Sequence, residues 1–420
     1  MASVQPSTTT ASAASSAQPG RHPVAFSVMT TVFFMWGFIT CLNDILIPHL
    51  KGSFNLNYTQ AMLVQFCFFG AYFICSVPAG KILHRVGYKR GVMLGLAIAG
   101  VGALLFYPAA ELAQYWLFLA ALFVLASGIT LLQVAANPYV VALGPSATSA
   151  SRLNLAQAFN SLGTTVAPII GGALIFTGIE AATAAEDAAS VQLPYVGLAL
   201  ALFAIAVVLG FIKMPTLRDE EEQTAEPAKL AEALSHRHLL FGVIAIFLYV
   251  GGEVAIGSFL VNFLGQEDVA GLSEASAANY VAIYWGGAMV GRFIGSALMT
   301  RVKPGLLLGV HGVLAVLLVA TAASSSGTLA LYTILAVGLC NSIMFPTIFS
   351  LALESLGRLT SAGSAALCLA IVGGALVPLL QGVVADMAGL RIAFIVPIVC
   401  YVYIVWYGLR GSIPTTTPGW

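Results

Sequence analysis

Long apolar segments alternate with short polar ones from about residue 24 to residue 410. A lipid bilayer has a hydrocarbon core about 30 Å thick, which a helix of about 20 apolar residues can cross. Twelve segments are long enough, so we predict an all-α membrane protein with twelve transmembrane helices. The predicted helices cover residues 24–50, 59–84, 88–107, 113–143, 151–178, 191–213, 238–264, 275–300, 304–323, 327–355, 360–387 and 390–410.

Composition supports this class and excludes others. Hydrophobic residues make up 59% of the 420 residues and charged residues only 8%, whereas soluble proteins carry about 25% charged residues. The formal net charge is zero, so the sequence offers no case for nucleic-acid binding. The six cysteines lie in apolar segments without a CxxC spacing, so we expect no disulfide framework, no metal site and no cofactor.

The longest polar break, residues 214–237, contains the acidic run Asp219 to Glu222 and also Glu226. Charge runs of this kind are typical of solvated segments, so we predict two bundles of six helices joined by a linker. The predicted organisation is a disordered tail at 1–23, a first bundle at 24–213, the linker at 214–237, a second bundle at 238–410 and a tail at 411–420.

The two predicted bundles share weak matches at corresponding positions. A polar residue precedes a proline by five positions in the fourth and tenth helices, and a glycine does so in the fifth and eleventh. The matching residues are Gln133 and Pro138 with Asn341 and Pro346, and Gly163 and Pro168 with Gly373 and Pro378. Together they favour a six-plus-six repeat, an arrangement that places a substrate near the membrane midplane between the halves.

Lysine and arginine are unevenly distributed between the two predicted sides of the membrane. Fourteen lie on the side of the termini and the linker, Lys51 and Arg391 lie on the opposite side, and Arg292 lies inside a span. Because basic residues are enriched in cytoplasmic loops, we expect both termini in the cytoplasm. The fourteen are Arg21, Lys81, Arg85, Lys89, Arg90, Arg152, Lys213, Arg218, Lys229, Arg237, Arg301, Lys303, Arg358 and Arg410.

Two carboxylates lie inside apolar helices. Asp44 follows a stretch without charge, and an acidic side chain in the bilayer centre costs about 2.5–3.5 kcal/mol on insertion scales. It must therefore face water, a partner or a ligand, which makes it the first candidate for proton coupling. Glu253 lies fifteen residues into the seventh helix, about 22 Å along it at about 1.5 Å per residue. It is either a second functional acid or a structural, hydrogen-bonded group.

Amide and aromatic side chains recur on single faces of the predicted helices. Gln133 and Asn137 are four residues apart, and Gln157 and Asn160 are three apart, spacings that share a helix face. Amides and carboxylates bind sugar hydroxyls, and aromatic rings pack on the apolar face of a sugar; the alternative is hydrogen bonding between helices. The candidate substrate-binding residues are Asn43, Gln65, Tyr72, Gln133, Asn137, Gln157, Asn160, Glu253, Asn262, Trp285 and Asn341.

Other chemistry is weakly represented. No HExxH, GxSxG or P-loop string occurs, so we expect neither an enzyme nor an ATP-driven pump. His311 is expected to be a satisfied or lipid-interface histidine, and His49 is a candidate for a proton path. Glu354 and Arg358, four residues apart, are expected to form a local gate or capping pair.

One stretch resembles the signature between helices two and three of the major facilitator superfamily. Gly80, Arg85, Gly87, Lys89 and Arg90 match that signature, whereas His84 stands where an aspartate is usual. The resemblance implies the two-half transporter fold of that superfamily. It also implies gating roles for the five matching residues, to which we add Arg292.

Residues 36–46, 135–139, 154–163 and 249–254 resemble the fucose–proton symporter family of sugar transporters. This resemblance implies hexose uptake by alternating access in a bacterial inner membrane, with Asp44 in proton coupling. Gln133 stands where the fucose symporters carry a glutamate, which favours the glucose/galactose-type branch, whose substrates extend to N-acetylated sugars. We therefore expect a monomeric sugar symporter, with Asp44 and Glu253 as coupling residues. Sodium coupling and export of another solute are the alternatives.

Overall fold

The computed structural model describes residues 22–53, 58–175, 192–215 and 229–414. Side chains at 42–62, 65, 168–175, 274, 275 and 278 also lie outside the described residues. Within the described ranges every regular element is helical, as predicted, and no strand occurs.

Apart from the short turn η1, the described helices of the first half have 20 residues or more. They are α1 (Pro23–Ser53), α2 (Tyr58–Glu111), α3 (Tyr115–Ala142), η1 (Ser146–Thr148), α4 (Ser149–Ile175) and α6 (Gln192–Phe211). The second half is more segmented. Its helices are α8 (Leu230–Leu234), α9 (Arg237–Leu264), α10 (Glu274–Leu298), α11 (Pro304–Ser324), α12 (Gly327–Asn341), α13 (Met344–Ala352), η2 (Gly357–Leu359), α14 (Thr360–Leu369), η3 (Ala370–Val372), α15 (Gly373–Ala388), α16 (Leu390–Ala393), α17 (Ile395–Trp406) and η4 (Tyr407–Gly411).

Where the structure describes them, the predicted spans coincide with helix. Ten stretches of the described residues are long and apolar enough to cross a membrane, and one of them, Phe66–Glu111, has 46 residues, enough for two crossings. The predicted break between residues 84 and 88 is a kink within α2 rather than a loop. Gly87 makes the kink with a φ of 78° and a ψ of 170°, a conformation that glycine adopts at little cost.

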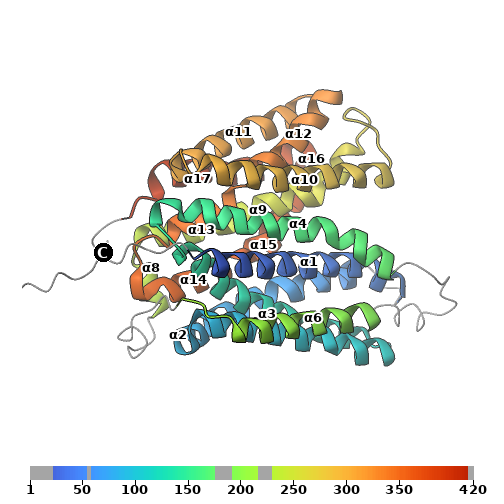
Figure 1. Cartoon of the computed structure of the whole chain (residues 1–420). Helices are drawn as coiled ribbons and strands as arrows, with labels where there is room; N and C mark the ends of the chain where they lie inside the picture. Colours follow the sequence, from blue (N-terminus) through green and yellow to red (C-terminus); the bar gives the residue numbers. More distant parts are fainter. Residues whose placement is uncertain (1–21, 54–57, 176–191, 216–228, 415–420) are drawn as a thin grey trace, which may run out of the picture.

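The long helices lie side by side along one direction, as Figure 1 shows. The C-terminal end and α8 lie at one end of this bundle, which we call the α8 end. There α2 approaches α14 so closely that a Cβ at Gly80 would lie 2.8 Å from the Cβ of Ala365. The two halves are therefore in contact at the α8 end.

The repeat-related glycines make equivalent contacts in the two halves. A Cβ at Gly163 would lie 2.1 Å from the carbonyl oxygen of Phe34, so α4 packs backbone to backbone on α1. A Cβ at Gly373 would lie 2.1 Å from the carbonyl oxygen of Phe247, and there the start of α15 packs on α9. The sequence match between Gly163 and Gly373 thus corresponds to the same close helix approach in each half.

Two of the matched prolines, Pro138 and Pro346, each leave a main-chain oxygen without its helical partner. Proline has no N–H, so the carbonyl four residues earlier loses its helical partner. Pro138 in this way frees the oxygen of Val134, which accepts a hydrogen bond of 2.8 Å from the Ser364 hydroxyl of the other half. Pro346 frees the oxygen of Ser342, and the chain breaks there between α12 and α13.

One ion pair connects separate elements of the second half at each of its ends. At the α8 end Arg358 pairs with Glu232 of α8, so the expected pairing with Glu354 is wrong. The Glu354 carbonyl instead lies 2.9 Å from Nε2 of His238. At the opposite end Arg391 donates a hydrogen bond of 2.7 Å to Asp268.

Candidate functional site

Amides of the first half meet between α3 and α4. Gln133, Asn137 and Gln157 are all buried, with 3%, 0% and 5% of their surface exposed. Nε2 of Gln157 donates to Oδ1 of Asn137 over 3.4 Å. Asn137 and Gln157, one from each predicted pair, therefore form a cluster with Gln133, which lies one helical turn before Asn137 on α3.

The second half contributes a matching group around Asn341. Its Nδ2 donates to the Tyr284 hydroxyl over 2.7 Å, and its main-chain oxygen accepts a 3.0 Å hydrogen bond from the Tyr249 hydroxyl. Glu253 is half-buried one helical turn beyond Tyr249 and interacts electrostatically with Tyr249 and Arg292. Asn341 and Glu253 thus lie in one tyrosine-lined polar group.

Arg292 of α10 joins the two groups. Its Nε donates over 3.0 Å to the Ser342 oxygen that Pro346 leaves free. Its Nη1 donates to the Ser161 hydroxyl on α4, in the other half. Ser161 in turn donates over 3.1 Å to the main-chain oxygen of Gln157. Among the described residues Arg292 and Glu253 form no ion pair, and the guanidinium instead bridges the halves.

Four buried polar atoms of this cluster make no hydrogen bond with any described residue. They are Oε1 of Gln133, Nδ2 of Asn137, Oδ1 of Asn341 and Oε1 of Glu253. A buried polar atom without a partner costs about 1–3 kcal/mol. The first half thus leaves one acceptor and one donor without a partner among the described residues, and the second half leaves two oxygens, all of which a polar ligand could satisfy.

Aromatic rings flank the cluster. Tyr72 is buried on α2 with its ring centroid 5.4 Å from that of Phe68. Trp285 is 42% exposed and packs edge-on against Tyr284 at 5.2 Å. Trp285 thus offers accessible apolar surface beside the tyrosine that bonds Asn341.

Other candidates lie away from the cluster or outside the described residues. Nδ2 of Asn160 donates over 2.9 Å to the oxygen of Phe33, a contact that joins α4 to α1. Asn262 is exposed near the end of α9. His311 bonds the Leu307 oxygen of its own helix over 2.9 Å, as expected of a satisfied histidine. The side chains of Asn43, Asp44, His49 and Gln65 lie outside the described residues.

The candidate gating residues of the signature differ in their contacts. Nζ of Lys89 donates over 2.9 Å to the oxygens of Gly210 and Ile212. This contact satisfies carbonyls at the end of α6 within the first half. Arg85 and Arg90 are exposed at the α8 end. Of the signature residues, Gly80 makes the close contact with the other half.

Sequence reasoning missed the residues that connect the cluster. Tyr249 lies four residues before Glu253, a spacing that indicates a shared helix face. Ser161 and Ser364 gave no signal of their own, because serine is common in apolar helices. The partner of Ser364 follows from Pro138, which frees the main-chain oxygen of Val134 four residues earlier, and Pro346 likewise frees the Ser342 oxygen that Arg292 contacts.

An all-helical membrane chain with a polar cluster shared between two similar halves is a multi-pass membrane transporter. The chain belongs to the Major Facilitator Superfamily, whose family description matches residues 24–374. It is 57% identical over 388 residues to a glucose/galactose transporter of Brucella abortus, covering 92% of this chain and 94% of that one.

More distant relatives show the same fold. The chain is 34% identical over 407 residues to the L-fucose-proton symporter of Escherichia coli, covering 92% of this chain and 93% of the other. The crystal structure of the transporter FucP in the outward conformation superposes with a TM-score of 0.86 at 33% identity, over 93% of this chain and 99% of that one.

Proposed function

We propose that the protein imports a hexose together with protons by alternating access. The observation that carries this proposal is the set of four buried polar atoms, two from each half, that have no hydrogen-bond partner among the described residues. A hexose hydroxyl both donates and accepts hydrogen bonds, so one sugar ring can satisfy carbonyl, amide and carboxyl groups on both sides at once.

The names of the relatives support the substrate class. The relative at 57% identity is named a glucose/galactose transporter, and the relative at 34% identity is named an L-fucose-proton symporter. We propose glucose or galactose as the principal substrate, because the nearer relatives carry that name. Fucose and N-acetylglucosamine are the sugars to compare with them.

The proposed sugar ligands are the cluster residues Gln133, Asn137, Gln157, Asn341 and Glu253, with Trp285 as a stacking surface. Asn43, Gln65, Tyr72, Asn160 and Asn262 complete the proposed set. Asp44 is the proposed proton-coupling residue, assisted by Glu253. Gln133 carries no titratable group, so coupling in the first half depends on Asp44 within this proposal.

The α8 end is proposed to face the cytoplasm, since it carries most of the described lysines and arginines. Contacts at this end then close the cytoplasmic side of the sugar site. Inward opening must break the bond of Arg292 to Ser161, because these residues belong to different halves. Signature residues Gly80, Arg85, Gly87, Lys89 and Arg90 are proposed to guide that movement.

The remaining proposals concern organisation. Because both halves of the cluster come from one chain, we propose that a monomer in the bacterial inner membrane is the working unit. The tails at 1–23 and 411–420, the bundles at 24–213 and 238–410, and the linker at 214–237 are the proposed domains.

Uptake in proteoliposomes tests the function. Radiolabelled glucose, galactose, fucose and N-acetylglucosamine are offered under a proton gradient or a sodium gradient imposed separately. Accumulation under the proton gradient alone supports the proposal. Accumulation under the sodium gradient alone means that sodium, and not the proton, is the coupling ion. No sugar uptake under either gradient contradicts the proposed function. Asp44→Asn should abolish accumulation and retain sugar exchange.

A further inference from the structure

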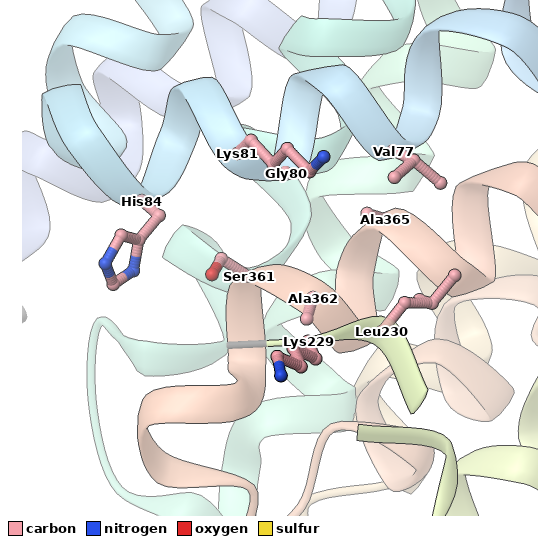
Figure 2. Close-up of a pocket in the computed structure, with 9 residues that line it drawn as sticks. All are labelled: Val77, Gly80, Lys81, His84, Lys229, Leu230, Ser361, Ala362 and Ala365. Atoms are coloured by element: carbon pink, nitrogen blue, oxygen red, sulfur yellow. The ribbon is translucent and has the colours of Figure 1, made fainter. Parts of the chain in front are cut away.

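A separate cavity of about 280 Å³ lies at the α8 end, between α2, α8 and α14 (Figure 2). We call it the gate cavity, because Gly80 in its wall makes the close approach between α2 and α14. Its lining residues are Val77, Gly80, Lys81, His84, Lys229, Leu230, Ser361, Ala362 and Ala365. The polar cluster contributes none of them.

The lining of the gate cavity is basic. Lys81 and Lys229 bring two ammonium groups, and none of the described lining residues is acidic. Figure 2 shows Lys81 and His84 on the α2 wall, with Lys229 and Ser361 on the opposite wall. Glu232, the acid of the neighbouring α8, is already paired with Arg358. The cavity therefore carries positive charge that its own described walls do not compensate.

We propose that the gate cavity binds a phosphate group, either as the free ion or as a small monoester, and that binding holds the α8 end closed. Phosphate oxygens accept charge-assisted hydrogen bonds from ammonium groups such as those of Lys81 and Lys229, and further bonds from a hydroxyl donor such as Ser361. A cavity of about 280 Å³ has room for about nine water molecules at about 30 Å³ each. It therefore exceeds the needs of a phosphate ion and leaves space for part of an ester.

The position of the cavity makes such an anion a regulator. Lys81 belongs to the first half, whereas Lys229 and Ser361 lie on the other wall. Opening the α8 end moves α2 away from α14 and separates the two lysines. A ligand that binds one conformation more tightly shifts the population toward it. A bound phosphate group therefore favours the closed conformation and slows the transport cycle.

The experiment measures the melting temperature of the purified full-length protein in detergent. Sodium phosphate, glycerol 3-phosphate and sodium chloride are compared at equal ionic strength, with no sugar present. Failure of the sugar proposal thus leaves this test unaffected. The cavity variant combines Lys81→Gln with Lys229→Gln. The control variant combines Lys213→Gln with Lys303→Gln, which removes the same charge from exposed lysines at the same end of the protein.

We expect a saturable rise in melting temperature with a phosphate compound but not with chloride. The cavity variant should need at least tenfold more anion for the same rise, and the control variant should match the unmodified protein. A rise with inorganic phosphate identifies the free ion as sufficient, and a rise only with glycerol 3-phosphate identifies the ester. An equal rise with chloride, an equal rise in both variants, or no rise with either phosphate compound overturns the proposal.

Discussion

The Ser364 hydroxyl donates a hydrogen bond of 2.8 Å to the Val134 oxygen that Pro138 leaves without its helical partner. Both residues are buried, and the bond joins α14 of one half to α3 of the other. A net hydrogen bond contributes about 0.5–1.5 kcal/mol. Ser364→Ala should therefore shift the equilibrium about two- to tenfold away from the conformation closed at the α8 end.

Pulsed electron paramagnetic resonance measures this shift through spin labels at Arg90 and Arg301, which are exposed on different halves near the α8 end. Ser412→Ala serves as the control. Its hydroxyl is also buried but bonds the Gly408 oxygen within the same half. Equal distance distributions in the two variants would show that the Ser364 bond does not stabilise the closed conformation.

Arg292→Lys tests the bridge between the halves. A lysine keeps the charge but lacks the planar fork of a guanidinium, so it cannot serve Ser161 and Ser342 in the same geometry. Charge-assisted bonds of this kind contribute about 1.5–3 kcal/mol. We expect sugar exchange in proteoliposomes to fall by about tenfold or more. Arg301→Lys, at an exposed position beyond the same helix, should exchange at the normal rate. Normal exchange in Arg292→Lys would remove the bridge from the transport cycle.

Gly163→Ala and Gly373→Ala test the equivalent glycine contacts. Each added Cβ would lie 2.1 Å from a carbonyl oxygen of a neighbouring helix, so the helices must move apart. Overpacking of this kind costs about 1–3 kcal/mol, and both variants should melt at a lower temperature. Gly197→Ala is the matched control, since nothing lies within 4 Å of its added Cβ. An undiminished melting temperature in both test variants would contradict the close packing.

The spans were predictable from the sequence because a bilayer imposes a minimum apolar length, and this constraint acts on each helix separately. The kink at Gly87 was not, because a glycine between two spans fits a loop as well as a positive φ. The repeat-related glycines and prolines were recognised as matches, but what they contact depends on helices far away in the chain. Gly163 meets Phe34, and the carbonyl freed by Pro138 meets Ser364.

The hydrogen-bond partners of the polar residues were even harder to predict from the sequence. Helical spacing grouped Gln157 with Asn160, yet Gln157 bonds Asn137 on α3 whereas Asn160 bonds the Phe33 oxygen on α1. An amide in an apolar helix needs a partner, and the sequence does not say whether a ligand or a neighbouring helix supplies it. Arg358 likewise had an acid four residues away but pairs with Glu232, which the chain brings from the start of the second half.

Glu253→Gln separates the functional interpretation of Glu253 from the structural one. The substitution keeps the shape and hydrogen-bonding capacity of the side chain and removes its ability to carry a charge. If Glu253 binds sugar and takes part in coupling, the apparent affinity for glucose should fall about tenfold and the pH dependence of uptake should change. If it is a structural group, the melting temperature alone should change. Glu267→Gln, an exposed acid beyond the same helix, should leave all three unaltered. Unchanged affinity and pH dependence in Glu253→Gln would exclude Glu253 from both roles and leave proton coupling to Asp44.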